Sequence, residues 1–407
     1  MSRSNLRLAN FPKLSAGLGR PRDFRLTFLG TSGGGGPTPS RGCTATSLTT
    51  FSDQTWLIDC AAGTLRQIRR VQPSIRLKNI KRIFITHLHS DHVMGIIDLL
   101  KARLRSDEDP EHQSDQANIH LYGPPGLRQF VRMNLDMTFS ELHGRYTVHE
   151  LRHADDPAST APLHELRPDE VLGRDIVSGP DNRWRLFDSE RDEVFVDAAP
   201  LVQRVPCIGY VFSVRRRGPI SQLPLPAGNL ETSDGVGSEQ SIPEWREAPM
   251  KIAILGDTSD ASAIAPLAMD ADAIVHEATN MVSDSERGWQ SEEAARDNAL
   301  SRGHSTARMA GDFARSVNAR MLFLNHLNSH VADVSSIRLP TFLDHRRSVD
   351  SALGLLRHRH EGAELTDSVK EQAGRGYPGE VVVARDFLTY VFSLNEDRVL
   401  VRCMNSD

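Results

Sequence analysis

Three histidines and one aspartate stand within six residues of one another, at His87, His89, Asp91 and His92. Imidazole nitrogens and carboxylate oxygens are ligands that suit zinc and similar divalent ions. The β-prone residues 83–86 come directly before them, so His87 and His89 can point to one side of an extended chain. Asp91 and His92 follow where the chain turns, and they can face a second point in space. The segment therefore has the residue types and the spacing to begin two neighbouring metal sites.

The elements around this segment must hold the ligands in place. A strand at 83–86 precedes it, and the apolar run after Gly95 predicts a buried helix, so the ligands stand on a rigid base. Three later segments, at 250–255, 272–275 and 321–324, are predicted strands, and the residues at their ends are Asp257, His276, Glu277 and His326. Layered α/β folds gather such residues at one edge of a sheet. The sequence thus predicts an α/β fold with a site at a sheet edge.

The composition fits a globular protein with an ample core. The 407 residues are 39% hydrophobic and 25% charged, enough chain for one large or two ordinary domains. The net charge of -5 gives no overall basic character, so any nucleic-acid contact must be a local patch. No apolar run approaches the roughly 20 residues of a membrane helix. The four scattered cysteines lack CxxC spacing and indicate reduced thiols of an intracellular protein.

Residues 1–22 are predicted to form a basic N-terminal extension. They contain five basic residues and no acidic one. This composition suits a disordered tail and also suits a mitochondrial presequence. We favour the tail, and a nuclear or cytosolic location over the mitochondrion.

The remaining residues, 23–407, are predicted to form one domain with two insertions. The first, at about 152–192, is acidic, contains prolines and has an irregular pattern. The second, at about 213–249, is rich in proline, glycine and serine and shows no helical periodicity. Near its start stand three consecutive arginines, Arg215, Arg216 and Arg217. These arginines could bind RNA phosphates or could form an ordinary solvated surface, and the sequence leaves both interpretations open.

A glycine run, Gly33 to Gly36, follows a predicted strand at 24–30. Such a run lets backbone amides approach a phosphate or a metal-bound oxyanion closely. The Gly-Lys-Ser/Thr of a nucleotide-binding P-loop does not follow it. The run is therefore a candidate part of the site, with a surface turn as the alternative.

Five short motifs follow one another along the chain. They are His87-x-His89-x-Asp91-His92, Gly256-Asp257, His276-Glu277-Ala278-Thr279, Gly303-His304-Ser305 and Asn325-His326. Further blocks are Phe28-Leu29-Gly30-Thr31-Ser32, Asp59-Cys60-Ala61-Ala62-Gly63-Thr64, Tyr122-Gly123-Pro124-Pro125-Gly126 and Pro206-Cys207-Ile208-Gly209-Tyr210. In this order they resemble the metallo-β-lactamase superfamily, and within it the tRNase Z family. The resemblance implies an α/β fold of the metallo-β-lactamase type, a four-layer αβ/βα sandwich with two zinc ions at one edge.

The resemblance also implies which residues hold the metal. The ligands carried over by motif are His87 and His89 for the first ion, Asp91, His92 and His326 for the second, and Asp257 as a bridge between them. A hydroxide generated by the two metal ions would attack the phosphorus that joins precursor tRNA to its 3′ trailer.

Three residues are implied in the chemistry itself. The leaving oxygen of the tRNA needs a proton, which the resemblance assigns to His304 as general acid. Glu277 would orient His304 as its carboxylate partner. Asp91 joins these two in the catalytic set because it would hold a metal ion that activates the nucleophile.

One position departs from the family pattern. In the family a metal-binding histidine stands three residues before the Pro-x-x-Gly-Tyr block, and Gln203 stands there in this chain. A neutral amide oxygen is a poorer zinc ligand than imidazole. We therefore expect Gln203 to make at most a weak metal contact. The first ion would bind less tightly, or a harder ion such as Mn2+ would replace Zn2+.

Three functions are consistent with the sequence. The first is a metal-dependent endoribonuclease that removes the 3′ trailer of precursor tRNA, in a family whose members often form homodimers. The second is a phosphodiesterase of the same fold that acts on cyclic nucleotides or other small phosphodiesters. The third is a scaffold whose catalysis is weakened by Gln203. The retained bridging and acid residues, Asp257 and His304, argue against the scaffold.

Overall fold

A computed structural model describes most of the chain. The described residues are 22–34, 36–38, 40–105, 115–157, 159, 161–189, 194–217, 245–280, 291–328, 331, 364–395 and 398–404. The predicted N-terminal extension lies outside them except for Arg22, where the first strand begins.

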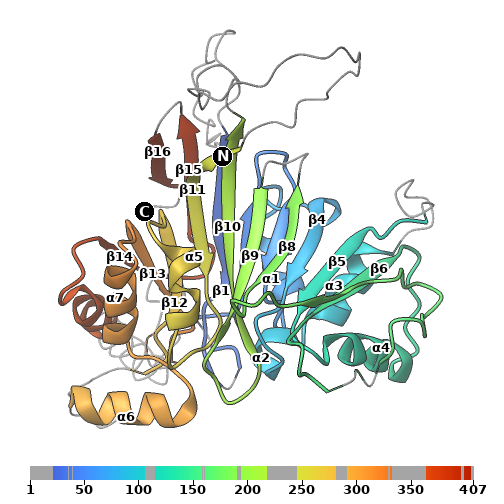
Figure 1. Cartoon of the computed structure of the whole chain (residues 1–407), viewed down its shortest axis with the longest axis horizontal. Helices are drawn as coiled ribbons and strands as arrows, with labels where there is room; N and C mark the ends of the chain where they lie inside the picture. Colours follow the sequence, from blue (N-terminus) through green and yellow to red (C-terminus); the bar gives the residue numbers. More distant parts are fainter. Residues whose placement is uncertain are drawn as a thin grey trace, which may run out of the picture.

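Two mixed sheets form the body of the described chain (Figure 1). The nine-stranded sheet has the order β16 (Arg398–Cys403), β15 (Thr389–Asn395), β1 (Arg22–Gly30), β2 (Ala45–Thr49), β3 (Thr55–Ile58), β4 (Ile80–Phe84), β5 (Ile119–Gly123), β6 (Tyr146–Arg152) and β7 (Asp175–Val177). The seven-stranded sheet has the order β14 (Glu380–Val383), β13 (Met321–Asn325), β12 (Ala273–Glu277), β11 (Trp245–Ile254), β10 (Cys207–Arg217), β9 (Val194–Leu201) and β8 (Trp184–Ser189).

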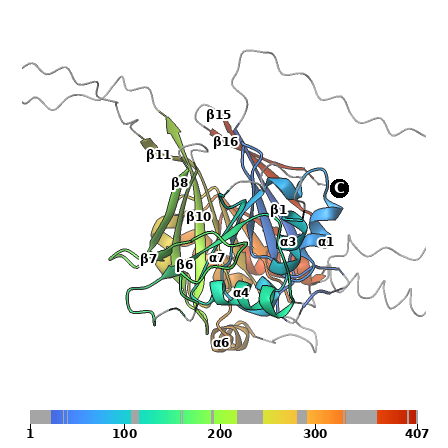
Figure 2. The ribbon, with the colours of Figure 1, turned by 90° about the vertical axis from the view of Figure 1, so that its right-hand side faces the viewer.

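The two sheets pack face to face over a shared apolar core. Alternate residues of β1 point inward, namely Phe24, Leu26 and Phe28, as the period of two in a strand requires. The ring of Phe28 lies 5.6 Å from that of Phe323 on β13, in the other sheet. Figure 2 shows the strands as two neighbouring layers, with β8 and β10 on one side and β1, β15 and β16 on the other.

Helices cover the outer faces of both sheets. On the nine-stranded sheet lie α1 (Thr64–Arg70), α3 (Ile96–Arg103) and α4 (Leu127–Met137). On the seven-stranded sheet lie α5 (Ala265–Ala268) and α7 (Ala307–Ser316), with the short helix η3 (Ser262–Ile264). Further helices are α2 (Ser90–Val93), α6 (Glu292–Arg302) and η1 (Leu77–Asn79), and residues 364–374 are helical as well. The predicted four-layer αβ/βα sandwich is confirmed.

The two predicted insertions contain more strand than their composition indicated. The segment 152–192 was expected to be irregular, but it contains β7 and β8, which form the edges of the two sheets. Their side chains alternate too briefly to stand out in sequence, and pairing with β6 and β9 stabilises them. In the segment 213–249, β10 continues to Arg217 and β11 begins at Trp245. Residues 218–244, between these strands, lie outside the described residues.

None of the helices in the described part of the chain has the length and apolar character needed to cross a bilayer.

Candidate metal centre

The ligand candidates gather at one end of the two sheets. The loop after β4 carries His87, and α2 carries Asp91 and His92. Asp257 follows β11 in the other sheet, and His326 follows β13. In Figure 1, α2 lies at the lower end of β4, where these loops meet. Both sheets therefore deliver residues that are far apart in the sequence to one edge.

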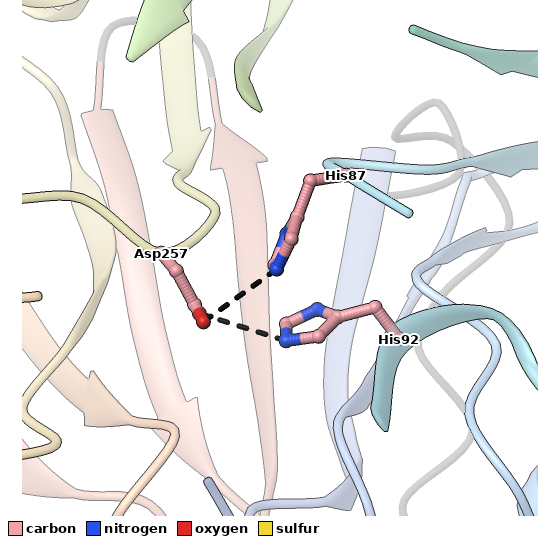
Figure 3. A group of neighbouring side chains, drawn as sticks. All are labelled: His87, His92 and Asp257. Atoms are coloured by element: carbon pink, nitrogen blue, oxygen red, sulfur yellow. Dashed lines mark ion pairs between the residues drawn. The ribbon is translucent and has the colours of Figure 1, made fainter. Parts of the chain in front are cut away.

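Asp257 lies at the centre of this group. Its Oδ2 lies 3.6 Å from Nε2 of His87 and 3.3 Å from Nε2 of His326. Its Oδ1 lies 3.6 Å from Nε2 of His92. Figure 3 shows His87 and His92 reaching toward this carboxylate from the chain segment after β4. The central position suits a carboxylate shared between two ions.

A second carboxylate, Asp91, completes the group on the side of His326. Its Oδ2 lies 3.4 Å from Nε2 of His326 and 3.9 Å from Nε2 of His92. The backbone N–H of Gly34 donates to the same oxygen at 3.1 Å. The glycine run is thus part of the site, with one of its amides directed at a ligand candidate.

Three overlapping sets of side chains have donor atoms close enough for one ion. The atoms of each set lie within 4.8 Å of one another. The sets are His87, His92 and Asp257; Asp91, His92 and His326; and Asp257, His304 and His326. Such overlap is what two neighbouring ions with shared ligands require.

Hydrogen bonds behind the rings determine which nitrogen faces the centre. Thr86 donates its hydroxyl proton to Asp59 at 2.9 Å, so its oxygen accepts from Nδ1 of His87 at 3.0 Å. Asp59 also accepts from Nδ1 of His92 at 2.8 Å. When these two rings are neutral, as metal ligands must be, their unprotonated nitrogen is therefore Nε2, which faces Asp257.

The ring of His326 is oriented in the same way. Thr279 donates its hydroxyl proton to Glu277, so its oxygen accepts from Nδ1 of His326 at 2.8 Å. Nε2 of His326 then directs its lone pair at the centre. Gly33 packs so closely on this ring that a Cβ there would lie 2.4 Å from Nδ1. Only glycine fits at that position without moving His326.

The lone pairs of the histidine nitrogens would lie so close together that they repel one another, and a bound cation would remove this repulsion. Nε2 of His92 and Nε2 of His326 are 3.2 Å apart, and both carry a lone pair when the two rings are neutral. Nε2 of His87 lies 2.9 Å from Nδ1 of His89, which is half-buried beside it. Imidazole and carboxylate donors in this number suit zinc. The residues therefore fit a centre for divalent metal.

The surroundings of Asp257 and His87 favour the ligand forms of these two groups. Burial by itself would raise the pKa of the Asp257 carboxyl, but the neighbouring rings of His326 and His92 hold it well below its usual range. Burial, together with the charge of His92, lowers the pKa of His87. At neutral pH Asp257 is therefore anionic, and His87 is neutral with its lone pair available.

His304 and Glu277 form a pair beside the ligands. Nδ1 of His304 lies 3.1 Å from Oε1 of Glu277 and 3.6 Å from Oδ2 of Asp257. The N–H of Thr258 donates to the same Glu277 oxygen at 2.7 Å and fixes the carboxylate. Burial disfavours the charged ring, but the hydrogen bond and charge of Glu277 outweigh it and raise the pKa of His304. A histidine that keeps its proton in this way suits a general acid.

Gln203 lies next to this pair. Its Oε1 accepts a hydrogen bond from the backbone N–H of Arg204. A Cβ on Gly303, whose φ is 77°, would lie 2.8 Å from that oxygen. Nε2 of Gln203 is buried and has no hydrogen-bond partner among the residues that the structure describes. Oε1, the atom of Gln203 that could bind a metal, thus already accepts a hydrogen bond from the backbone.

The backbone of the three consecutive arginines lies away from the metal centre. β10 begins beside it, where the N–H of Ile208 donates to Thr86 at 2.9 Å. The strand then runs away for its full length and ends at Arg217. Arg215, Arg216 and Arg217 therefore lie at the opposite end of the strand.

Comparisons with known proteins agree with this geometry. Residues 54–177 match the family model described as the beta-lactamase superfamily domain. The human protein named zinc phosphodiesterase ELAC protein 1 is 32% identical over 342 residues, 77% of this chain and 88% of that protein. Ribonuclease Z of Streptococcus sanguinis is 30% identical over 337 residues, 77% of this chain and 93% of that protein. The chain belongs to the ribonuclease Z family.

Solved structures extend the similarity to the fold. The structure of human tRNase Z, short form, has a TM-score of 0.54 at 28% identity and covers 90% of this chain and 98% of that one. A long form of RNase Z from yeast has a TM-score of 0.51 at 17% identity, covers 90% of this chain and 42% of that one, and supports the fold alone. The predicted family and fold type are confirmed, as is the prediction of an enzyme of this ribonuclease Z group.

Several supporting residues of this ribonuclease Z family member were not singled out from the sequence. Asp59 and Thr86 orient two ligand candidates, and Thr279 orients a third. A signal existed for two of them, because Asp59 and Thr279 stand inside the quoted family motifs. No sequence signal pointed to Arg204, which stands next to Gln203.

Proposed function

We propose that this chain is a metal-dependent endoribonuclease that hydrolyses the phosphodiester bond between precursor tRNA and its 3′ trailer. The similarity to proteins named ribonuclease Z and tRNase Z supports the substrate. The observation that carries the reaction type is the His304–Glu277 pair, which stands beside the convergent ligand candidates. Phosphodiester hydrolysis needs both a centre that activates water and an acid for the leaving group.

The centre is proposed to hold two zinc ions. One ion would be held by Asp91, His92 and His326. The other ion would be held by His87 and His89, and Asp257 would bind both ions. When bound, two zinc ions would polarise the phosphate and lower the pKa of a water molecule toward neutrality. Because Gln203 gives no imidazole, the ion beside His87 and His89 is the one expected to bind weakly or to exchange with manganese.

His304 is proposed to supply the proton that the reaction consumes. Its Nδ1 is held by Glu277, so Nε2 is the atom that can face a substrate. As the oxygen of the attacking water bonds to phosphorus and the P–O3′ bond breaks, proton transfer from Nε2 to the departing 3′ oxygen avoids a free alkoxide. The tRNA then ends in a 3′ hydroxyl, and the trailer keeps the phosphate at its 5′ end.

Assembly and location remain parts of this proposal. We propose a homodimer, as is frequent in the family, and sedimentation of the purified chain tests it. We also propose an intracellular enzyme of the nucleus or cytosol, where precursor tRNA is available. Imaging of the tagged chain with and without residues 1–22 tests whether that extension directs it to the mitochondrion.

Substrate comparison tests the proposed function. The metal-loaded chain is given a precursor tRNA with a 3′ extension and, separately, a 2′,3′- or 3′,5′-cyclic nucleotide. We expect cleavage of the tRNA after its discriminator base and no comparable hydrolysis of the cyclic nucleotide. Activity on the cyclic nucleotide alone would replace the proposal with the small-phosphodiester alternative. If the chain hydrolyses none of these phosphodiesters with either zinc or manganese, the scaffold is the function that remains.

A further inference from the structure

Arg204 lies on the turn beside the loop that carries His304. Its side chain is exposed, and none of the described side chains forms a hydrogen bond or ion pair with it. Other arginines of the described chain are paired with carboxylates, as Arg132 is with Glu170 at 2.7 Å. An arginine without such a partner, next to a site for phosphate chemistry, is available to an external anion.

The backbone around Arg204 is fixed from three sides. The N–H of Val202 donates to Asp260 at 3.1 Å, and Ser259 donates back to Val202 at 2.8 Å. The N–H of Arg204 itself is bonded to Oε1 of Gln203. A Cβ on Gly303 would lie 3.2 Å from the Arg204 nitrogen. The turn is therefore held against the loop after Asp257 and against the loop that carries His304.

The charge of Arg204 reaches both halves of the site. Burial is the main cause that lowers the pKa of His89, and the Arg204 guanidinium adds to that lowering. At His304, burial also disfavours the charged ring and Glu277 favours it, while Arg204 again acts against it. One guanidinium thus acts on a ligand candidate of the first ion and on the proposed acid. In the proposed reaction the scissile phosphate lies between those two groups.

We propose that Arg204 binds the nonbridging oxygens of the scissile phosphate. The role rests on the proposed phosphodiester hydrolysis and adds a substrate-binding residue to it. A planar guanidinium can bind two phosphate oxygens at once and stabilises the charge that grows on them as the bond breaks. Gln203 stands where the family has a metal-binding imidazole, so a weakly bound first ion would stabilise the negative charge of the phosphate less. Arg204 provides positive charge at that same side of the site.

This role has two consequences of opposite sign. Removal of the guanidinium takes a positive charge away from the substrate, so catalysis becomes weaker. It also takes a like charge away from the metal ions, so zinc binds at least as tightly as before. If Arg204 only supported the fold of the centre, its removal would weaken both catalysis and zinc binding.

The experiment compares the wild type with Arg204→Ala, Arg204→Lys and the control Arg69→Ala. Arg69 is an exposed arginine on α1, on the outer face of the nine-stranded sheet. The substrates are 3′-extended precursor tRNA and bis(p-nitrophenyl) phosphate, which has the phosphodiester and no tRNA body. Zinc affinity is measured without substrate by competition with a chromogenic chelator, and thermal melting confirms that each variant is folded.

We expect Arg204→Ala to lower kcat/KM by about 10- to 100-fold on both substrates, with zinc affinity unchanged or higher. Arg204→Lys should retain part of the activity, and Arg69→Ala should match the wild type. If Arg204→Ala hydrolyses bis(p-nitrophenyl) phosphate at the wild-type rate, the inference is overturned. It is also overturned if Arg204→Ala loses zinc affinity and activity together. Either result leaves the proposed function intact. If the zinc-loaded wild type cleaves neither substrate, the proposed function fails and the role of Arg204 falls with it.

Discussion

Nδ1 of His304 lies 3.1 Å from Oε1 of Glu277, and this contact leaves Nε2 of His304 as the nitrogen available to a substrate. A departing ribose oxygen is strongly basic and needs a proton, whereas p-nitrophenolate leaves without one. We therefore expect His304→Ala to slow cleavage of precursor tRNA by about 100- to 10,000-fold. Hydrolysis of bis(p-nitrophenyl) phosphate should fall much less. Steady-state rates on both substrates measure the difference, and an equal loss on the two would contradict the general-acid role.

The same contact determines how activity depends on pH. Burial opposes the charged form of His304, and Glu277 more than offsets this, so the pKa of His304 is raised. The acid is protonated below that pKa and loses its proton as the pH rises through it. Glu277→Gln should lower the pKa and move the alkaline limb of the kcat/KM profile on precursor tRNA to lower pH. Asp260→Asn, at an exposed carboxylate in the neighbouring loop, is the control. A profile that is lower at every pH but unshifted would exclude this role of Glu277.

Asp59 should control metal affinity without being a ligand. It accepts hydrogen bonds from Nδ1 of His92 and from the hydroxyl of Thr86, and both orient imidazoles toward the centre. Asp59→Asn should weaken zinc binding by about 10- to 100-fold, measured by chelator competition. Asp53→Asn is a matched control, because Asp53 shares the φ of 61° but is exposed and bound to Arg25. Equal zinc affinity in the two variants would show that the ligands hold their orientation without Asp59.

Gln203→His should restore a strong ligand to the weaker metal position. Imidazole binds zinc better than a neutral amide, so zinc retained after dialysis and the rate on precursor tRNA should both rise. Elemental analysis measures the zinc per chain. Gln116→His, at an exposed position, controls for the added histidine. If neither the zinc content nor the rate increases over the wild type, the assignment of position 203 is wrong.

His149 should make the fold less stable in acid, independently of the metal centre. Burial and the neighbouring ring of His120 lower the pKa of His149 to about 3, and its ring stacks on Tyr122 at 4.5 Å. An unfolded chain binds a proton at His149 below pH about 6.5, whereas the folded chain does not. Stability is therefore present above that pH and is lost as the pH falls toward the folded pKa. The loss amounts to about 1.4 kcal/mol at pH 5.5.

His149→Phe should remove this part of the pH dependence while keeping an aromatic ring on Tyr122. Urea unfolding at pH 7.5 and pH 5.5 gives the free energies to compare with the wild type. His164→Asn, at an exposed position, is expected to follow the wild type. If His149→Phe and the wild type lose the same stability between the two pH values, His149 is not the group responsible.

The main features of the fold follow from local pattern. The alternation of Phe24, Leu26 and Phe28 and the motif after β4 were enough to predict strands, layers and a site at a sheet edge. The strands β7 and β8 were not predicted, because they are short and are stabilised by pairing with the neighbouring strands β6 and β9. The continuation of β10 to Arg217 was missed because the charged residues there carry no apolar signal.

The ligand candidates were predicted from residue type, spacing and the resemblance to the family, but their surroundings were not. Asp59, Thr86 and Thr279 act through hydrogen bonds between distant loops, and such contacts have no spacing in the sequence. The position of Gln203 was predicted, yet the bond of its oxygen to the N–H of Arg204 depends on how the turn folds. Arg204 became a candidate only when its turn proved to lie against the loop of His304, with no side chain of the described residues bonded to its guanidinium.

The ends of the reaction products test the central claim most directly. The zinc-loaded chain is incubated with a 3′-extended precursor tRNA, and both fragments are sequenced and probed for phosphate. We predict a tRNA that ends in a 3′ hydroxyl at the discriminator base and a trailer with a 5′ phosphate, with cleavage lost on chelation and restored by zinc. Cleavage elsewhere, a phosphate left on the tRNA, or activity that survives chelation would contradict the account.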